Sequence, residues 1–218
     1  QLFENYPRSY SVDMKIRMRW IRGDWQIFSW ILPWVQGPKK HFYKNPISPL
    51  SRWKIFDNIR RSLVPIALIL FLLVGWIAFS AVLFWTITVS VIIIFPIVVS
   101  TLWDTLRKPK NVLIRYHLQN YFQNLKEVTV RTLFTIICLP YEAFVNFKTI
   151  IKTLWRMVVS GKKLLEWNPS SNTSQAFQSS LRGSYSIMWI EPVLTIVVLL
   201  ILINQAPQKL NVVAPIML

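Results

Sequence analysis

The sequence predicts an all-α membrane protein, and three observations support this class. Hydrophobic residues make up 53% of the 218 residues and charged residues only 16%, a balance that soluble domains do not show. From Ser62 to Trp103 the chain has no Lys, Arg, Asp, Glu or His. A bilayer core about 30 Å thick takes about 20 helical residues to cross, so this run is long enough for two crossings. Eleven Trp also fit the membrane–water interface.

The formal charge of +16, from 25 Lys and Arg against nine carboxylates, points to an anionic partner such as lipid or a phosphorylated substrate. Nucleic acid is not expected, because the cations flank apolar spans rather than cover one soluble face. His41 and His117 lie far apart with no carboxylate or thiol at ligand spacing, so we expect no metal site built within this chain.

Residues 1–50 are expected to be the end of a cytoplasmic module, with Pro33, Gly37 and Pro38 breaking residues 32–50 into loops. Residues 51–61 combine apolar residues at helical spacing with cations, which predicts an interfacial helix with Trp53 at the membrane surface. Residues 62–103 should form a transmembrane hairpin with spans near 63–80 and 83–103, the second kinked at Pro96.

Residues 104–186 are predicted to be cytoplasmic or interfacial helices followed by a polar linker. The stretch 128–147 is apolar enough to cross, but Arg131, Pro140 and Glu142 interrupt it. Beyond it, Lys148, Lys152 and Arg156 recur every four residues and mark one face of an interfacial helix.

Charge distribution favours the same topology. Residues 1–61 hold twelve Lys or Arg and the turn between the first two spans holds none, so the N-terminal side should be cytoplasmic. Residues 187–218 would then be a second transmembrane hairpin, with a third span at about 187–204 and a cut final helix from 212. Because the chain opens at Gln1 and stops within this run, we expect it to be an internal piece of a longer polypeptide.

The strip from Asp13 to Gln26 carries the residues whose chemistry suits substrate binding. It holds four Lys or Arg, two Trp and two Asp. Arg presents paired donors to a diphosphate, Trp offers an apolar face to a sugar ring, and a carboxylate accepts hydrogen bonds from sugar hydroxyls. On spacing alone, however, a membrane-interface anchor explains such a strip better.

Residues 6–26 closely resemble the end of the glycosyltransferase module of bacterial cyclic β-1,2-glucan synthases, and include Arg17-Met18-Arg19-Trp20-Ile21-Arg22-Gly23-Asp24-Trp25-Gln26. The resemblance continues at residues 50–58 and 60–65 and reappears at 139–143 (Leu-Pro-Tyr-Glu-Ala), 153–156 and 164–167. It therefore covers most of the chain.

This resemblance implies a multi-pass enzyme of the bacterial inner membrane that makes β-1,2-glucan from UDP-glucose on the cytoplasmic side and closes it into a ring. Its partners would be UDP-glucose, the growing glucan, the rest of the parent polypeptide and the lipid bilayer. It also implies a divalent metal, Mg or Mn, whose ligands would lie outside this chain, and a tail of a GT-A-type domain at the N-terminus.

The same strip resembles the Gln-x-x-Arg-Trp motif of processive membrane glycosyltransferases. By that resemblance Arg19 would contact the diphosphate and Trp20 would stack on the acceptor sugar. The Gln position falls on Ile16, which puts that contact in doubt. The substrate-binding residues expected from the strip are Arg17, Arg19, Trp20, Asp24, Trp25 and Gln26, and the interface residues are Trp53, Lys148, Lys152 and Arg156.

No catalytic residue is assigned to this chain, because Asp13 and Asp24 lack a paired carboxylate, so the isolated chain is expected to be inactive. Two other readings stay open. One is a non-catalytic membrane module that binds anionic lipid or a cytoplasmic partner. The other is a transporter or channel subunit, which should carry polar residues at mid-span, where these spans offer little beyond Ser and Thr.

Overall fold

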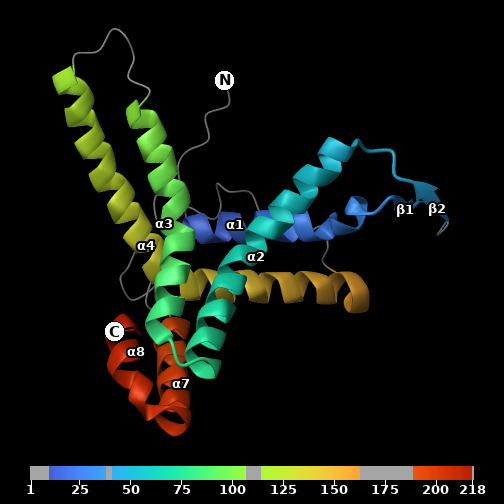
Figure 1. Cartoon of the computed structure of the whole chain (residues 1–218). Coiled ribbons are helices and arrows are strands. Elements are labelled where there is room, and N and C mark those ends of the chain that lie inside the picture. Colours follow the sequence, from blue (N-terminus) through green and yellow to red (C-terminus); the bar gives the residue numbers. More distant parts are fainter. Residues whose placement is uncertain (1–9, 38–40, 107–113, 163–188, 218) are drawn as a thin grey trace. The chain divides into compact units, whose positions relative to one another are not determined.

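The computed structural model describes residues 10–37, 41–106, 114–162 and 189–217, and helices dominate this part of the chain (Figure 1). The main helices are α1 Tyr10–Gln26, α2 Pro49–Ala78, α3 Val82–Leu106, α4 Ile114–Trp155, α7 Ile190–Gln205 and α8 Leu210–Met217. Short turns of helix are η1 Phe28–Ile31, the π-helix η3 Arg156–Ser160 and η4 Pro207–Lys209, and a small hairpin joins β1 Trp34–Gln36 to β2 Phe42–Lys44. The all-α class is confirmed.

The chain forms two compact units, and α2 and α4 each contribute to both. Residues 1–67 and 141–193 make the first unit, and residues 68–140 and 194–218 make the second. Each unit is described by itself below.

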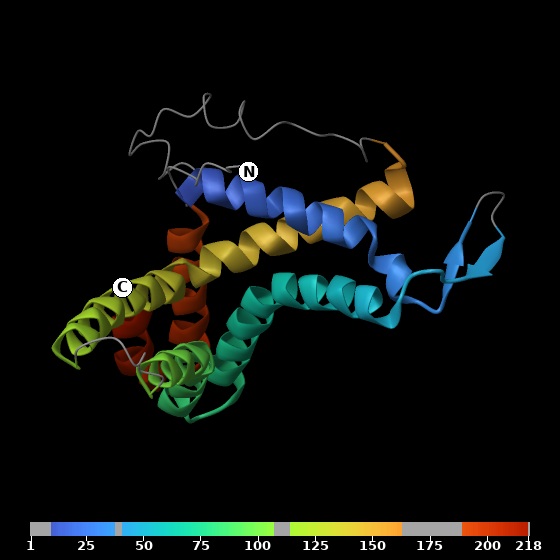
Figure 2. The same cartoon turned by 90° about the horizontal axis from the view of Figure 1, so that it is seen from above.

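In the first unit, α1 lies beside the C-terminal part of α4 (Figure 2). Met14 and Ile21 are buried from α1, and their spacing of seven residues puts them on one helical face. From α4 the buried residues Asn146, Ile150 and Thr153 recur at spacings of four and three. These two stripes are part of the buried interior of the unit.

In the second unit, the core gathers where α2 turns into α3. Trp76, Val82, Val198, Leu202 and Val213 are buried together, and the Trp76 indole Nε1 donates to Thr86 Oγ1 at 2.9 Å. A Cβ at Gly75 would come within 2.5 Å of the Trp85 ring, so only glycine lets the two helices approach this closely.

Lys209 joins the two turns of the second unit. Its ammonium Nζ donates to three carbonyl oxygens at and just beyond the end of α2, those of Trp76 at 2.9 Å, Ile77 at 3.2 Å and Phe79 at 2.8 Å. The last carbonyls of a helix have no partner within the helix, and a cation there also meets the negative end of the helix dipole. The contact places both turns at one end of the unit.

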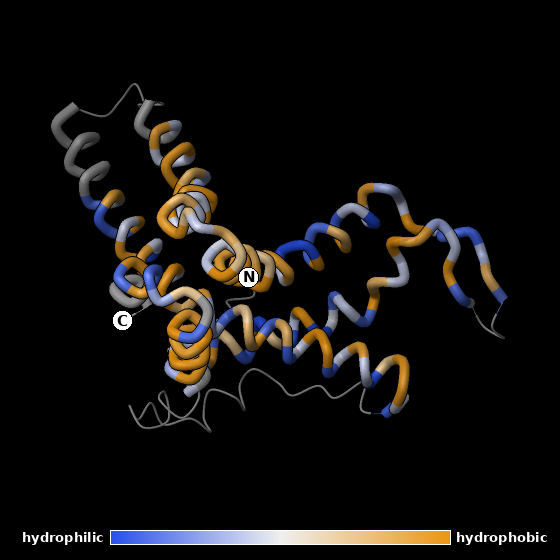
Figure 3. Tube along the Cα trace, turned by 60° about the horizontal axis from the view of Figure 1, so that its bottom comes forward, coloured by the Kyte–Doolittle hydropathy of each residue, from blue (hydrophilic) through white to orange (hydrophobic). Residues whose placement is uncertain are grey.

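Among the described residues, three helical stretches are long and apolar enough to cross a membrane: Pro49–Ala78, Val82–Trp103 and Leu125–Ser160. Apolar residues follow one another along α3 and α7 (Figure 3). Length and composition therefore also permit Leu125–Ser160 to cross, and its predicted interfacial position stays a prediction. Contacts within the first unit favour the interfacial position: α4 contacts α1 and α2 through Tyr141, Glu142 and Asn146.

Three observed features differ from the sequence-based expectations. The helix α2 runs through the predicted boundary near residue 62 and keeps Pro65 inside it, so an interfacial and a spanning part would belong to one helix. The hairpin β1–β2 stands where only loops were expected. The 16 residues of α7 rise about 24 Å at 1.5 Å per residue, less than a bilayer core, since the helix begins at Ile190 and not near residue 187. The predicted linker 168–184 lies outside the described residues.

Candidate functional site

The helix α1 carries the Arg-Trp strip and is held to α4 by a charged contact. Glu142 Oε1 accepts hydrogen bonds from the Tyr10 hydroxyl and from Arg17 Nη1, both at 3.2 Å. Arg17 Nε also pairs with Asp13 Oδ2 at 2.8 Å, one turn earlier on α1. Arg17 thus lies between two carboxylates, which orient its guanidinium and stabilise α1 on α4.

A second contact holds the other end of α1 to α2. Trp25 Nε1 donates to Ser62 Oγ at 3.0 Å, and the Ser62 hydroxyl donates to the Ile59 carbonyl at 2.7 Å. The buried Asn146 amide of α4 donates to the Ser62 carbonyl at 3.0 Å. Ser62 lies three residues before Pro65, where the helical hydrogen bonds are weakened. Three helices therefore meet at Ser62.

Asp24 is the third fixed point of α1. Its Oδ1 accepts from Asn58 Nδ2 at 3.2 Å. Burial raises the pKa of Asp24 above its usual value, and the Asn58 hydrogen bond and the Arg61 charge lower it by less. A carboxyl in this position loses part of its hydration without a full counter-charge.

We expect Asp24→Asn to leave the thermal unfolding midpoint at pH 7 unchanged or slightly higher. A raised pKa means that the folded state binds the proton more tightly than the unfolded state, so ionisation of Asp24 lowers stability as the pH rises through the folded pKa. The amide oxygen of the variant can still accept the hydrogen bond from Asn58. Unfolding curves of Asp24→Asn and the unsubstituted chain should show any rise in midpoint at pH 7 and none at pH 3.5. A clear fall of the midpoint at pH 7 would contradict a destabilising ionisation of Asp24.

Trp20 is the most exposed of the predicted substrate residues. Its side chain is 58% exposed, while Val12, Met14 and Ile21 make the buried face of α1. Helical spacing places Arg17 one turn before Trp20 and Asp24 one turn after it. Gly23, on the same side, leaves open space where a Cβ would stand. An aromatic ring is thus presented to solvent between a cation and a carboxylate, on a helix fixed at both ends.

The structure separates the other predicted residues. Arg19 and Gln26 are half-buried on α1. Trp53 lies on α2, and its ring contacts the tilted ring of Phe56 at 5.5 Å between centroids. On α4, Lys148 and Lys152 are exposed, whereas Arg156 is half-buried at the start of η3.

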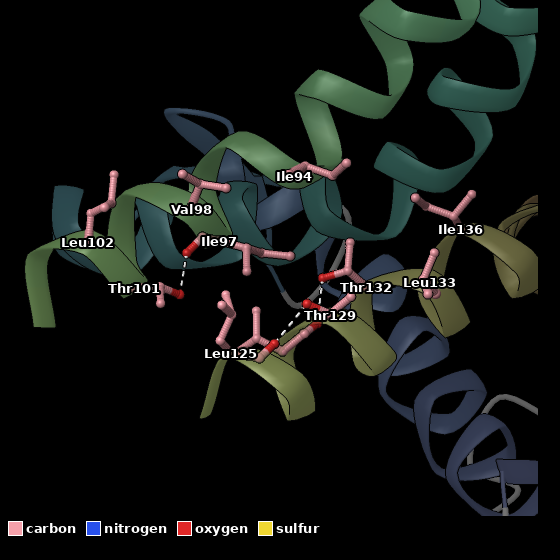
Figure 4. A pocket seen from close by; sticks show the side chains of 11 residues that line it. Ile94, Ile97, Val98, Thr101, Leu102, Leu125, Thr129, Thr132, Leu133 and Ile136 are labelled. Carbon is pink, nitrogen blue, oxygen red and sulfur yellow. Dashed lines mark hydrogen bonds between the residues drawn. The ribbon is translucent and has the colours of Figure 1, made fainter. Parts of the chain in front are cut away.

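A pocket of about 220 Å³ lies between α3 and α4 in the second unit (Figure 4). Its lining is Ile, Leu and Val, with Thr101, Thr129 and Thr132. Each Thr hydroxyl donates to a carbonyl of its own helix at 2.7–2.8 Å. The lining therefore offers hydrocarbon rather than free polar groups, and hydrocarbon fits it better than a sugar.

Sequence reasoning gave no contact to Ser62, Asn146 or Lys209, and it treated Glu142 as an interruption of an apolar run and as part of the segment that resembles the synthases, without a partner. The signal for Glu142 was available, since it falls within the Leu-Pro-Tyr-Glu-Ala segment at 139–143. A carboxylate in an otherwise apolar helix needs a partner, and Arg17 and Tyr10 supply it.

The fold and these contacts define a helical membrane protein in whose first unit a basic, tryptophan-bearing helix, α1, packs on α2 and α4. No family model matches the chain. The chain is 29% identical over 199 residues, 90% of its length, to the cyclic beta-(1,2)-glucan synthase NdvB of Rhizobium meliloti (strain 1021). The resemblance to cyclic β-1,2-glucan synthases is thereby confirmed. The chain spans 7% of the length of that relative.

Proposed function

We propose that the chain is part of a membrane glucosyltransferase that polymerises glucose from UDP-glucose into β-1,2-glucan, cyclic in the finished product. The similarity over 90% of the chain to a protein named a cyclic beta-(1,2)-glucan synthase carries this proposal. The exposed Trp20 on a fixed helix is consistent with it. The protein would lie in the bacterial inner membrane with its N-terminal segment cytoplasmic.

In this proposal α1 forms the acceptor side of the transferase site. Trp20 stacks on the acceptor sugar, and Arg19 contacts the diphosphate, where a cation stabilises the departing nucleotide. Arg17, Asp24 and Trp25 act mainly by holding α1 to α4 and α2, since their polar atoms contact Glu142, Asn58 and Ser62. Arg17 and Asp24 also border the Trp20 surface, and Gln26 lies one turn beyond Arg22.

The residues described here do not fit a metal site. Over the described ranges no three His, Cys, Asp or Glu side chains cluster to hold a metal ion. In the proposal a divalent metal would neutralise the diphosphate charge, with ligands from outside this chain.

Incorporation of labelled glucose from UDP-glucose into glucan tests the proposal. Membranes that carry the complete gene product should make labelled glucan whose linkage analysis shows 1,2 bonds. The 218-residue chain alone is the matched negative control, because it has no residue assigned as general base. Absence of glucan from the complete product would contradict the proposal, and transfer by the chain alone would contradict the assignment of catalytic groups to other segments.

A module that binds anionic lipid or a cytoplasmic partner is the second candidate function. The observation that favours it is the exposure of Lys148 and Lys152 beside exposed Phe147, Ile151 and Trp155. Such a face fits a bilayer surface.

Replacement of Lys148, Lys152 and Arg156 by Gln separates the two functions. Each cation near an anionic surface contributes about 1 kcal/mol, so the loss of three should weaken the preference for vesicles with phosphatidylglycerol. Glucan synthesis should persist at equal protein level if the transferase proposal holds. If the triple replacement abolished the function of the protein and Trp20→Ala had no effect on it, the lipid-binding module would be favoured.

A further inference from the structure

The β1–β2 hairpin presents two aromatic rings on one face. Its register pairs Trp34 with Lys44, Val35 with Tyr43 and Gln36 with Phe42. Because side chains alternate along a strand, Trp34, Gln36, Phe42 and Lys44 share one face. Trp34 is 57% and Phe42 68% exposed; on the other face Val35 is buried and Tyr43 is 52% exposed. We call these four residues the aromatic face.

The hairpin is held in place at its base. The Asn45 side-chain Nδ2 donates to the carbonyls of Trp30 at 2.6 Å and Leu32 at 2.8 Å. The backbone N–H of Asn45 donates to the Pro33 carbonyl at 2.8 Å. Arg52 Nε of α2 donates to the Ile31 carbonyl at 2.7 Å. The aromatic face is thus attached to the first turn of α2 through several hydrogen bonds.

The surroundings of the hairpin are apolar and cationic. Between Ile27 and Phe56 the sequence has five Lys or Arg and no Asp or Glu. Apolar and polar residues alternate along this stretch (Figure 3). Its further exposed large apolar residues are Ile27, Phe28, Trp30, Leu32, Tyr43, Leu50, Trp53 and Phe56. A water-facing surface rarely gathers so many exposed aromatic rings.

Charge and position together identify the occupant of the aromatic face. The hairpin precedes α2, whose apolar part is long enough to span a membrane. Trp at the headgroup level and Lys near anionic lipid are both favourable, and an aromatic ring also tolerates this region better than bulk water.

We propose that the aromatic face inserts into the headgroup region of the leaflet at the start of α2, with Lys44 directed to anionic lipid. The hairpin is then a membrane anchor separate from Trp53, and it holds η1, and through η1 the end of α1, at the bilayer surface. This inference does not depend on the proposed transferase activity.

A fluorescent label on each face of the hairpin tests the inference. Cys138 is the sole cysteine of the chain and is buried, so Cys138→Ser provides the background. Gln36→Cys, labelled with NBD, probes the aromatic face and leaves both rings in place. Tyr43→Cys is the matched control, since Tyr43 is exposed on the opposite face. The 218-residue chain is reconstituted in vesicles of phosphatidylcholine and phosphatidylglycerol.

We expect the label at residue 36 to shift to shorter wavelength and to be quenched by headgroup-level doxyl lipid several-fold more than the label at residue 43. Lys44→Gln should reduce that quenching in vesicles with phosphatidylglycerol and leave it unchanged in phosphatidylcholine alone. Far-UV circular dichroism and the unfolding midpoint should match between the variants. Quenching at residue 36 no greater than at residue 43 would overturn the inference, and so would a wavelength shift caused by added β-1,2-glucan rather than by lipid.

Discussion

Trp20→Ala should lower the incorporation of labelled glucose by about 10²-fold in membranes that carry the complete gene product. The ring is 58% exposed on a helix fixed by Glu142, Ser62 and Asn58. Its removal should therefore leave α1 in place and remove only the surface on which the acceptor sugar lies. Displacement of a reacting group by about 1 Å costs about 10²-fold in rate. Trp20→Phe should retain part of the activity.

Trp155→Ala is the matched control for this experiment. Trp155 is 61% exposed but lies at the end of α4, so the same change in chemistry and exposure should leave synthesis unaffected. Protein levels are compared by immunoblot. Unchanged synthesis with Trp20→Ala would make Trp20 a membrane anchor and not a sugar-binding residue.

Lys209→Met should lower the unfolding midpoint of the purified chain in detergent by several degrees. The substitution keeps an unbranched apolar side chain but removes the donors to the carbonyls of Trp76, Ile77 and Phe79. Carbonyls left without a partner cost about 1–3 kcal/mol, and about 1 kcal/mol corresponds to about 2–4 °C in a chain of this size.

The control is Lys162→Met, because Lys162 is exposed at the end of η3. It removes the same charge and should leave the midpoint within about one degree, as surface substitutions generally do. Equal midpoints for Lys209→Met and the unsubstituted chain would show that the turn between α7 and α8 does not depend on this contact.

The structure gives three predicted substrate residues a contact that holds α1 in place. From sequence, Arg17, Asp24 and Trp25 were grouped with Arg19 and Trp20 because cations, carboxylates and Trp suit a sugar nucleotide. Their polar atoms contact α4 and α2, while Trp20 is exposed. The role of all these residues in substrate binding stays a prediction.

The sequence by itself determined the class of the protein and most helix positions, because hydropathy and helical periodicity are local properties. The uncharged run from Ser62 to Trp103 needs no tertiary information to be placed on two apolar helices. The sequence also carried the resemblance to glucan synthases, since the motif residues are contiguous.

Only the tertiary structure decided which polar groups are partners. Trp25 and Ser62 are 37 residues apart in sequence, Arg17 and Glu142 are 125 apart, and Lys209 and Trp76 are 133 apart. No periodicity links residues at such separations. Their pairing follows from the packing of α1 on α2 and α4 and of the two turns on each other, where a polar group removed from water must find a hydrogen-bond partner.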